Sequence, residues 1–205
     1  ERVYRWSAED VPGIVFDNNI APRAAPYYPL LRCGTFKTWA DVVEWAEPLF
    51  SKNGTLPANM EKLVEQWKRT LPTPEARLQA AVSWVQNDVR YFAMALGDHN
   101  LRPRPLPEIC ESRFGDCKDK STLLVALLRE LGFQAWPALV NTYWQDRVQE
   151  YGPGPFAFNH AIVACQSGGK IHWIDATMKH QRPFAGEWAV PPYRQALILR
   201  PGETD

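Results

Sequence analysis

Apolar side chains between about residue 38 and residue 90 recur every three or four positions, which is the period of an amphipathic helix. Thr38 is placed to cap a first helix that runs to about Phe50. Thr73 followed by Pro74 marks the start of another, because a hydroxyl N-cap and a proline in the first turn both favour a helix start. The apolar positions that define the second and third helices are Met60, Leu63, Val64 and Trp67, then Leu78, Ala81, Val82, Val85 and Val89.

A further helix is predicted to begin at Cys117, after a loop over residues 97–107 that holds three prolines. Asp116 is its expected N-cap, and Asp119 follows three residues later as an acidic variant of the capping box. Gly132 is the expected C′ glycine, with Phe133 packing back on the helix. The apolar face comprises Leu124, Leu127, Leu128 and Leu131.

Beyond Gly132 the apolar period changes to two, which is typical of strands. Strands are predicted over residues 133–142, 158–165, 171–177 and 195–200. Helices followed by an antiparallel meander define an α+β fold.

The first 35 residues are rich in proline and aromatic side chains, a composition that excludes a long helix and predicts an extended arm. The chain begins at Glu1 without methionine, so it is expected to be part of a longer multidomain chain. We expect residues 1–50 to form an arm or linker from an upstream domain, and residues 51–205 to form the catalytic domain.

Composition narrows the function classes. Hydrophobic residues make up 45% of the chain and charged residues 22%, as in globular proteins. Lys+Arg and Asp+Glu both number 23, without a basic cluster, which argues against nucleic-acid binding. No apolar run is long enough to predict a transmembrane segment. The four cysteines show neither a disulfide framework nor a zinc-binding spacing, so no metal or other cofactor is expected.

Cys117 is the strongest candidate nucleophile. At the start of a helix a thiolate faces unpaired backbone N–H groups and the positive end of the helix dipole. Both stabilise the thiolate, which is the reactive form, and the same backbone can stabilise an oxyanion. The alternative is a small buried residue that happens to begin a helix.

His160 and Asp175 lie on two strands that are predicted to pair across residues 166–169. A four-residue loop places them directly opposite each other, and a two-residue turn at Gly168-Gly169 places them one diagonal apart. Both registers put imidazole and carboxylate on one face, whereas an odd loop length would separate them. In the first two cases Asp175 would orient the ring of His160. Alternatively, His160 is a hydrogen-bonded core residue and Asp175 caps a turn.

Three segments together resemble bacterial transglutaminase-like proteins. Residues 113–124, Arg-Phe-Gly-Asp-Cys-Lys-Asp-Lys-Ser-Thr-Leu-Leu, resemble their nucleophile segment. Phe158-Asn159-His160-Ala161 resembles their histidine strand, and Trp173-Ile174-Asp175-Ala176-Thr177 their aspartate strand. The resemblance covers about residues 75–180. It implies a papain-like fold, with the nucleophile at the N-terminus of a helix packed on an antiparallel sheet, and a triad of Cys117, His160 and Asp175. The first 50 or so residues resemble the segment after a β-rich domain of unknown function, in members that are often exported from the cytoplasm.

The implied activity is acyl transfer through a thioester on a peptide or protein substrate. Water as the acceptor gives a protease or amidase, and an amine gives a transglutaminase. Hydrolysis is slightly favoured, because amine transfer requires the exclusion of water and no feature of the sequence ensures it. The rival hypothesis is a non-catalytic peptide-binding or protein-binding module on the same fold.

The remaining candidates are weaker. Tyr91 is a candidate second oxyanion donor. Lys118 and Asp119 are expected to be partners of the helix cap. By strand parity Cys165 faces away from His160, and His172 faces away from Asp175. Cys110 is expected to be structural, and His99 either lines the cleft or is solvated.

Overall fold

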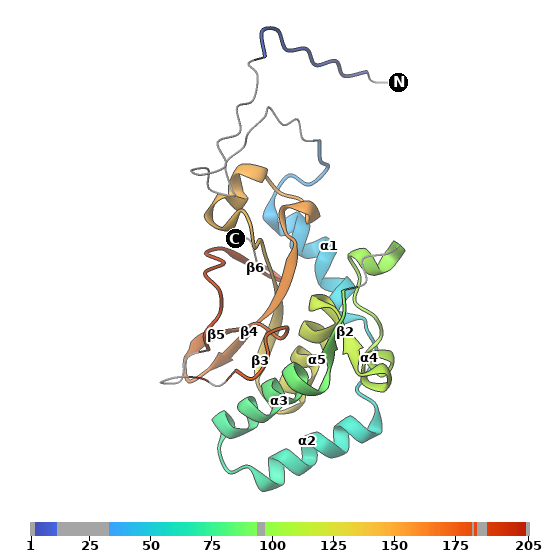
Figure 1. The fold of residues 1–205 in the computed structure, drawn as a ribbon, viewed down its shortest axis with the longest axis vertical. Helices are drawn as coiled ribbons and strands as arrows, with labels where there is room; N and C mark the ends of the chain where they lie inside the picture. Colours follow the sequence, from blue (N-terminus) through green and yellow to red (C-terminus); the bar gives the residue numbers. More distant parts are fainter. Residues whose placement is uncertain (1–2, 12–32, 94–96, 182, 184–187, 204–205) are drawn as a thin grey trace. The chain divides into compact units, whose positions relative to one another are not determined.

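The computed structural model describes residues 3–11, 33–93, 97–181, 183 and 188–203. The chain divides into two units, residues 1–33 and residues 34–205. In the first unit, residues 3–11 contain neither helix nor strand, and the rest of the predicted arm up to residue 32 lies outside the described residues. The described helices and strands all lie in the second unit (Figure 1).

The three predicted N-terminal helices are present as α1 (Trp39–Ser51), α2 (Ala58–Thr70) and α3 (Pro74–Asp88). Thr38 caps α1 in a complete capping box with Asp41, and the hydroxyl of Thr73 accepts a hydrogen bond from the N–H of Ala76. Helix α1 therefore belongs to the second unit and begins where its cap predicts.

Helix α5 (Cys117–Glu130) also begins and ends as predicted. The carboxylate of Asp116 accepts hydrogen bonds from the N–H groups of Lys118 at 2.9 Å and Asp119 at 3.2 Å. At the other end Gly132 has φ of +90°, and the N–H of Phe133 donates to the carbonyl of Leu128 at 2.9 Å. This is the Schellman hydrogen bond of a glycine-terminated helix.

The four predicted strands are β3 (Gln134–Val140), β4 (His160–Ser167), β5 (Lys170–Ile174) and β6 (Ala196–Ile198). They form one sheet in the order β5-β4-β3-β6, and every pairing is antiparallel. The α+β class is confirmed. The meander is only partly right: β3, β4 and β5 follow it, but β6 returns to pair with β3 at the opposite edge of the sheet from β5.

Several short elements between α3 and α5 were not predicted. Residues 97–107 are not one loop, since η1 (Gly97–Asn100) is a 3-10 helix and α4 (Leu106–Ser112) begins inside the range. Strands β1 (Arg90–Tyr91) and β2 (Phe114–Gly115) form a parallel pair of two residues each. Two more 3-10 helices, η2 (Gln145–Tyr151) and η3 (Pro155–Ala157), separate β3 from β4.

Helix α5 is central to the fold and lies between the sheet and helices α2 and α3 (Figure 1). Its apolar side chains join α2, α3, β4 and β5 in one core cluster. A second cluster joins α1 to β4 and β6. Consequently the N-terminus of α5 is fixed against the first residues of β4. No helix within the described residues has both the length and the apolar character needed to cross a membrane.

Candidate active site

Cys117 is the first residue of α5, and its thiol is free and half-buried. The turn before it is very tight. A Cβ atom at Gly115 would lie 2.6 Å from the Cβ of Asp119, so only glycine fits between β2 and the first turn of α5. This close approach sets the direction in which the chain enters the helix.

The side chain of Asp119 is held by Arg104 instead of closing the predicted capping box. Its two carboxylate oxygens accept from the backbone N–H and the Nε of Arg104, both at 2.8 Å. The guanidinium also donates to the carbonyl of Phe114 and lies 4.6 Å from the centre of its ring. The side chains of Arg104 and Asp119 are only 11% and 7% exposed, so this buried ion pair ties the loop before α4 to the nucleophile segment.

The turn between β4 and β5 decides between the two registers that the sequence left open. Ser167 pairs with Lys170, so the turn is the two-residue Gly168-Gly169, with φ of +59° and +78°. Positive φ at both positions is what a type I′ hairpin turn requires. Strand β5 ends at Ile174, earlier than predicted, and Asp175 is the next residue.

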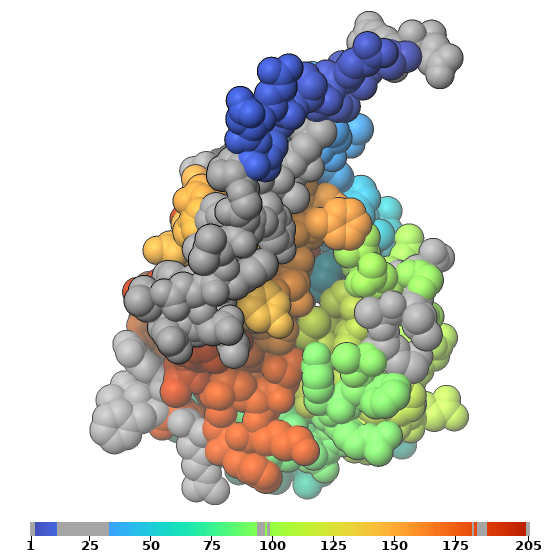
Figure 2. All heavy atoms as spheres, turned by 45° about the horizontal axis from the view of Figure 1, so that its top comes forward, coloured from blue at the N-terminus to red at the C-terminus, as the bar shows by residue number. Residues whose placement is uncertain are grey.

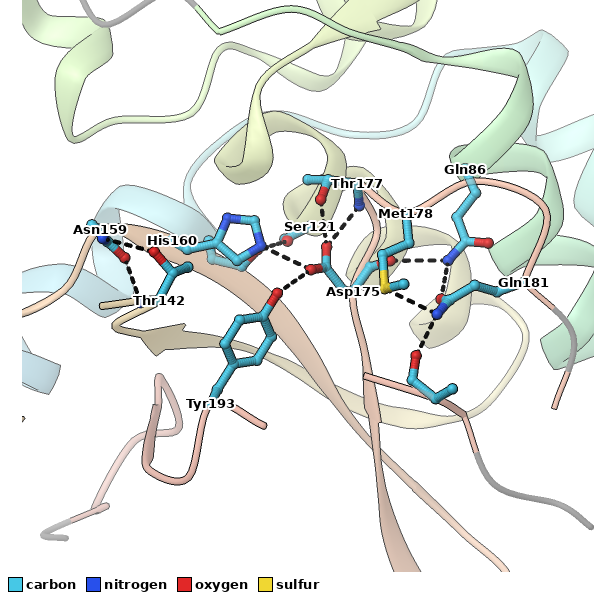
Figure 3. Close-up of polar contacts among 12 residues, drawn as sticks. Gln86, Ser121, Thr142, Asn159, His160, Asp175, Thr177, Met178, Gln181 and Tyr193 are labelled. Carbon is cyan, nitrogen blue, oxygen red and sulfur yellow. Dashed lines mark hydrogen bonds and ion pairs between the residues drawn. The ribbon is translucent and has the colours of Figure 1, made fainter. Parts of the chain in front are cut away.

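His160 and Asp175 are in contact, as the diagonal placement predicts. Imidazole Nε2 lies 3.0 Å from carboxylate Oδ2, and the two side chains are 12% and 2% exposed (Figure 3). Cys117 lies on the other side of the ring, near enough to contribute to the raised pKa of His160. Because Nε2 is engaged by Asp175, Nδ1 is the nitrogen left for the sulfur.

The charge state of His160 follows from these neighbours. Burial lowers the pKa of His160, but the hydrogen bond to the Asp175 carboxylate, together with the proximity of Cys117, raises it to about 9. The imidazole is therefore protonated at neutral pH. This is the state expected of a ring that is hydrogen-bonded to a carboxylate.

The carboxylate of Asp175 accepts four hydrogen bonds. Oδ1 accepts from the backbone N–H of Thr177 at 2.9 Å and from its hydroxyl at 2.7 Å, and Oδ2 accepts from His160 and from the hydroxyl of Tyr193 at 2.6 Å. Burial alone would raise the pKa of Asp175, but these donors and the charge of His160 lower it to about 2. The carboxylate is therefore ionised and fixed in orientation.

Tyr193 was not identified from the sequence. It lies in the segment before β6, and its ring centre is 5.8 Å from that of His160. Figure 3 shows Tyr193 and His160 converging on Asp175 from different parts of the chain. The return of β6 to β3 brings this segment back to the site, and no local sequence pattern signals that return.

Two residues of α5 anchor the nucleophile helix from within the core. The hydroxyl of Ser121 donates to the carbonyl of Ala161 on β4 at 3.0 Å. The fully buried ammonium of Lys120 donates to the carbonyl of Val89 at 2.5 Å, beyond the end of α3, and burial lowers its pKa to about 8. Both contacts hold the first turns of α5 in position relative to β4 and α3.

The other candidate residues are not part of the Cys117, His160 and Asp175 arrangement. Cys165 is buried and pairs with His172 in the sheet, in agreement with strand parity, and Cys110 is buried too. His99 is exposed in η1. Lys118 forms an ion pair with Asp116. Tyr91, in β1, is 42% exposed, and its pKa is raised by burial and by the nearby charge of Cys117.

Among the residues that the structure describes, no group of three or more His, Cys, Asp or Glu side chains is arranged to hold a metal ion. The chemistry that the arrangement offers is that of a sulfur, an imidazole and a carboxylate in series.

The fold and the site together define an α+β protein whose candidate active site has a cysteine thiol at the N-terminus of a helix. The sequence model of the Transglutaminase-like superfamily matches residues 61–178, more than half of the chain. The chain therefore belongs to the transglutaminase-like superfamily, which confirms the predicted relationship and fold.

Two solved structures are similar to this chain. A "putative protease" from Parabacteroides distasonis ATCC 8503 aligns with a TM-score of 0.59 at 12% identity, over 83% of this chain and 31% of that one. A "putative cysteine protease" from Cytophaga hutchinsonii aligns with a TM-score of 0.43 at 20% identity, over 58% of this chain and 37% of that one. The similarity to the Parabacteroides distasonis structure shows a shared fold. This chain spans about a third of the length of each of the two proteins. The search of curated proteins returned no match.

Proposed function

We propose that this chain is a thiol-dependent acyl-transfer enzyme that acts on peptide or carboxamide bonds, with Cys117 as nucleophile, His160 as acid and base, and Asp175 as the residue that orients His160. One observation carries the proposal. The imidazole of His160 is hydrogen-bonded to a buried, ionised Asp175, and Cys117 at the N-terminus of α5 lies near enough to raise the pKa of the ring.

The raised pKa of His160 supports a resting ion pair. With that pKa at about 9, the ring carries the proton at neutral pH. The proton then comes from the thiol, which leaves the sulfur as the thiolate nucleophile.

Acylation follows from this ion pair. Sγ of Cys117 attacks the carbonyl carbon, and the π electrons move onto oxygen to give a tetrahedral oxyanion. The Asp116 cap occupies the N–H groups of Lys118 and Asp119, so the N–H of Cys117 is the first-turn donor that the cap leaves for this oxyanion. When the intermediate collapses, the C–N bond breaks and the leaving nitrogen takes the proton from His160, which leaves a thioester on Cys117.

Deacylation reverses the proton flow. His160, now neutral, removes a proton from an attacking water or amine, and the thioester breaks to release the Cys117 thiolate. The four hydrogen bonds on Asp175 keep the imidazole in one orientation through both halves of the reaction. We favour water as the acceptor, because Cys117 is half-buried rather than enclosed and water can reach it.

The test combines covalent labelling with turnover. A peptide that carries a thiol-reactive electrophile should label the wild-type protein at Cys117 and fail to label Cys117→Ala. Cys33→Ser is the matched control, because Cys33 is an exposed free thiol elsewhere in the chain. The wild-type protein should then hydrolyse peptide substrates without an added primary amine.

Other outcomes would count against the proposal. Absence of labelling at Cys117 in folded protein would favour the binding-module hypothesis. Product formation that depends on the amine would replace hydrolysis by amine transfer.

A further inference from the structure

A cavity of about 280 Å³ opens beside the sulfur of Cys117 and the ring of His160. Figure 2 shows a recess between the green segment around residues 97–104 and the orange segment around residue 156, two of the segments that line the cavity. The volume lies below the ~300–1,000 Å³ of typical sites for drug-sized ligands, so the cavity suits one side chain rather than a whole small molecule.

The walls of the cavity are mainly apolar. Helix α1 supplies Trp45, Leu49 and Phe50, and β3 supplies Leu139. The segment before β4 supplies Phe158 as well as Phe156, which is 77% exposed. Apolar groups thus extend from the buried floor to the solvent-facing rim.

Two polar side chains of the lining are engaged by residues outside it. Lys118 is ion-paired with Asp116. The carboxamide of Asn159 accepts from the backbone N–H of Thr142 at 2.9 Å and donates to its hydroxyl at 3.0 Å. The remaining polar side chain of the described lining, Asn100, is exposed in η1. Because the walls are mainly apolar and two of the polar side chains are already paired, a charged or amide side chain that entered the cavity would lose its water for few new partners.

We propose that this cavity is the specificity pocket of the enzyme and that it takes one large apolar side chain, of leucine or phenylalanine size, from a peptide substrate. This inference rests on the proposed function, since the pocket matters only if Cys117 attacks a bound peptide. Its position beside Cys117 and His160 places the bound side chain within one or two residues of the carbonyl that is attacked.

The experiment uses N-acetyl dipeptidyl vinyl sulfones, which alkylate an active thiolate and differ in one side chain. Each of the two positions before the electrophile is varied among Leu, Phe, Ala, Gln, Asp and Lys. At one of the two positions, Leu or Phe should raise the rate of Cys117 labelling at least ~10-fold over Ala, and Gln, Asp and Lys should not.

Two variants test the walls of the pocket. Leu139→Trp fills the cavity and should reduce the Leu-to-Ala rate ratio to about 2-fold or less. Trp45→Leu enlarges the cavity and should move the preference from Leu toward Phe. Ile171→Trp is the matched control: it adds the same ring at an exposed site on β5 outside the cavity, and should keep the wild-type ratio. A ratio of two rates within one variant cancels any change in sulfur reactivity.

The outcomes separate the two proposals. If neither iodoacetamide nor any vinyl sulfone labels Cys117, the proposed function itself fails. If Cys117 is labelled but the rate is the same for all side chains, or is highest for Gln, Asp or Lys, the proposed function stands and the apolar pocket is overturned. The pocket is also overturned if the ratio survives in both Leu139→Trp and Trp45→Leu.

Discussion

Asp175 combines deep burial with a full set of donors. Its side chain is 2% exposed, and four N–H or O–H groups point at its two oxygens. An amide at this position has only one oxygen, so its NH₂ group must face donors from either Thr177 or the pair of His160 and Tyr193. The site therefore distinguishes between carboxylate and carboxamide although the two have the same shape.

Asp175→Asn should lower turnover by on the order of 10⁴-fold, as the equivalent change does in the serine protease triad. The unmatched donors should also cost about 1–3 kcal/mol in the free energy of unfolding. Steady-state kinetics and denaturant unfolding measure the two effects. Asp146→Asn, on an exposed site in η2, is the control and should change neither. If Asp175→Asn kept full turnover, Asp175 would have a structural role alone.

The pKa of His160 predicts the alkaline limit of activity. It is raised from 6.5 to about 9, so the proton on His160 stabilises the folded state fully below pH 6.5, and this contribution is lost as the pH rises through 9. Turnover should fall above pH 9, because the leaving nitrogen then has no proton donor. Iodoacetamide alkylation of Cys117 should persist there, since it needs only the thiolate.

Asp175→Asn should move this alkaline limit to lower pH, because Asp175 is a major cause of the raised pKa. Turnover that continued to rise above pH 9 in the wild type would contradict the assignment of His160 as the acid. For Asp175 the sign is opposite: its pKa is lowered from 3.8 to about 2, so its stabilising contribution is present above pH 3.8 and is lost as the pH falls through 2.

Cys117 should be the fastest of the four thiols to react. Burial raises the pKa of Cys110 to about 11 and that of Cys165 to about 12, so both are protonated at neutral pH and also inaccessible. With limiting iodoacetamide near pH 6, where ordinary thiols are almost fully protonated, peptide mapping should find Cys117 labelled first. His160→Ala should slow this labelling. Equally fast labelling of exposed Cys33 would show that Cys117 is not activated.

At the scale of elements, the tight approach of β2 to α5 makes Gly115 a critical position. An alanine Cβ would lie 2.6 Å from the Cβ of Asp119, which the buried ion pair with Arg104 prevents from moving. Gly115→Ala should therefore displace the first turn of α5, destabilise the fold by roughly 1–3 kcal/mol and slow the labelling of Cys117. Gly154→Ala is the control, because its Cβ would meet nothing within 4 Å and its φ of 166° is ordinary extended backbone. Equal melting temperatures for the two variants would refute the steric argument.

Elements with a local chemical signal were predictable from the sequence. Thr38, Thr73 and Asp116 cap helices at the positions where they were expected, and the glycine pair 168–169 makes the turn that aligns His160 with Asp175. The meeting of those two residues follows from strand parity together with the even length of this turn. This part of the site could therefore be predicted from short-range sequence patterns.

Elements whose existence depends on distant partners were missed. Strands β1 and β2 have two residues each, too few for a period, and they form by pairing with each other. Asp119 has the spacing of a capping residue, but Arg104, 15 positions earlier, competes successfully for its carboxylate. Tyr193 reaches Asp175 because β6 pairs with β3, and that pairing depends on the finished sheet.

At the scale of the molecule, the packing of α1 bears on where the proposed catalytic domain begins. The sequence placed that boundary at residue 51, yet Val42, Val43, Ala46 and Phe50 of α1 are buried in the cluster with β4 and β6. At about 1.5–3 kcal/mol for each large apolar side chain, their loss would approach the typical net stability of ~5–15 kcal/mol. Residues 34–205 should therefore fold cooperatively, whereas residues 52–205 should be largely unfolded. Circular dichroism melting of both fragments measures this, and equal melting temperatures would support the boundary at residue 51.

The position of α1 along the chain has an evolutionary consequence. The superfamily match begins at residue 61, so the proposed catalytic residues lie inside the shared segment, while Trp45, Leu49 and Phe50 come from a helix that precedes it. Inheritance can then act on the two separately. Related proteins that keep the segment from residue 61 to residue 178 but have a different preceding helix would retain the proposed chemistry. Their specificity for peptide side chains would differ.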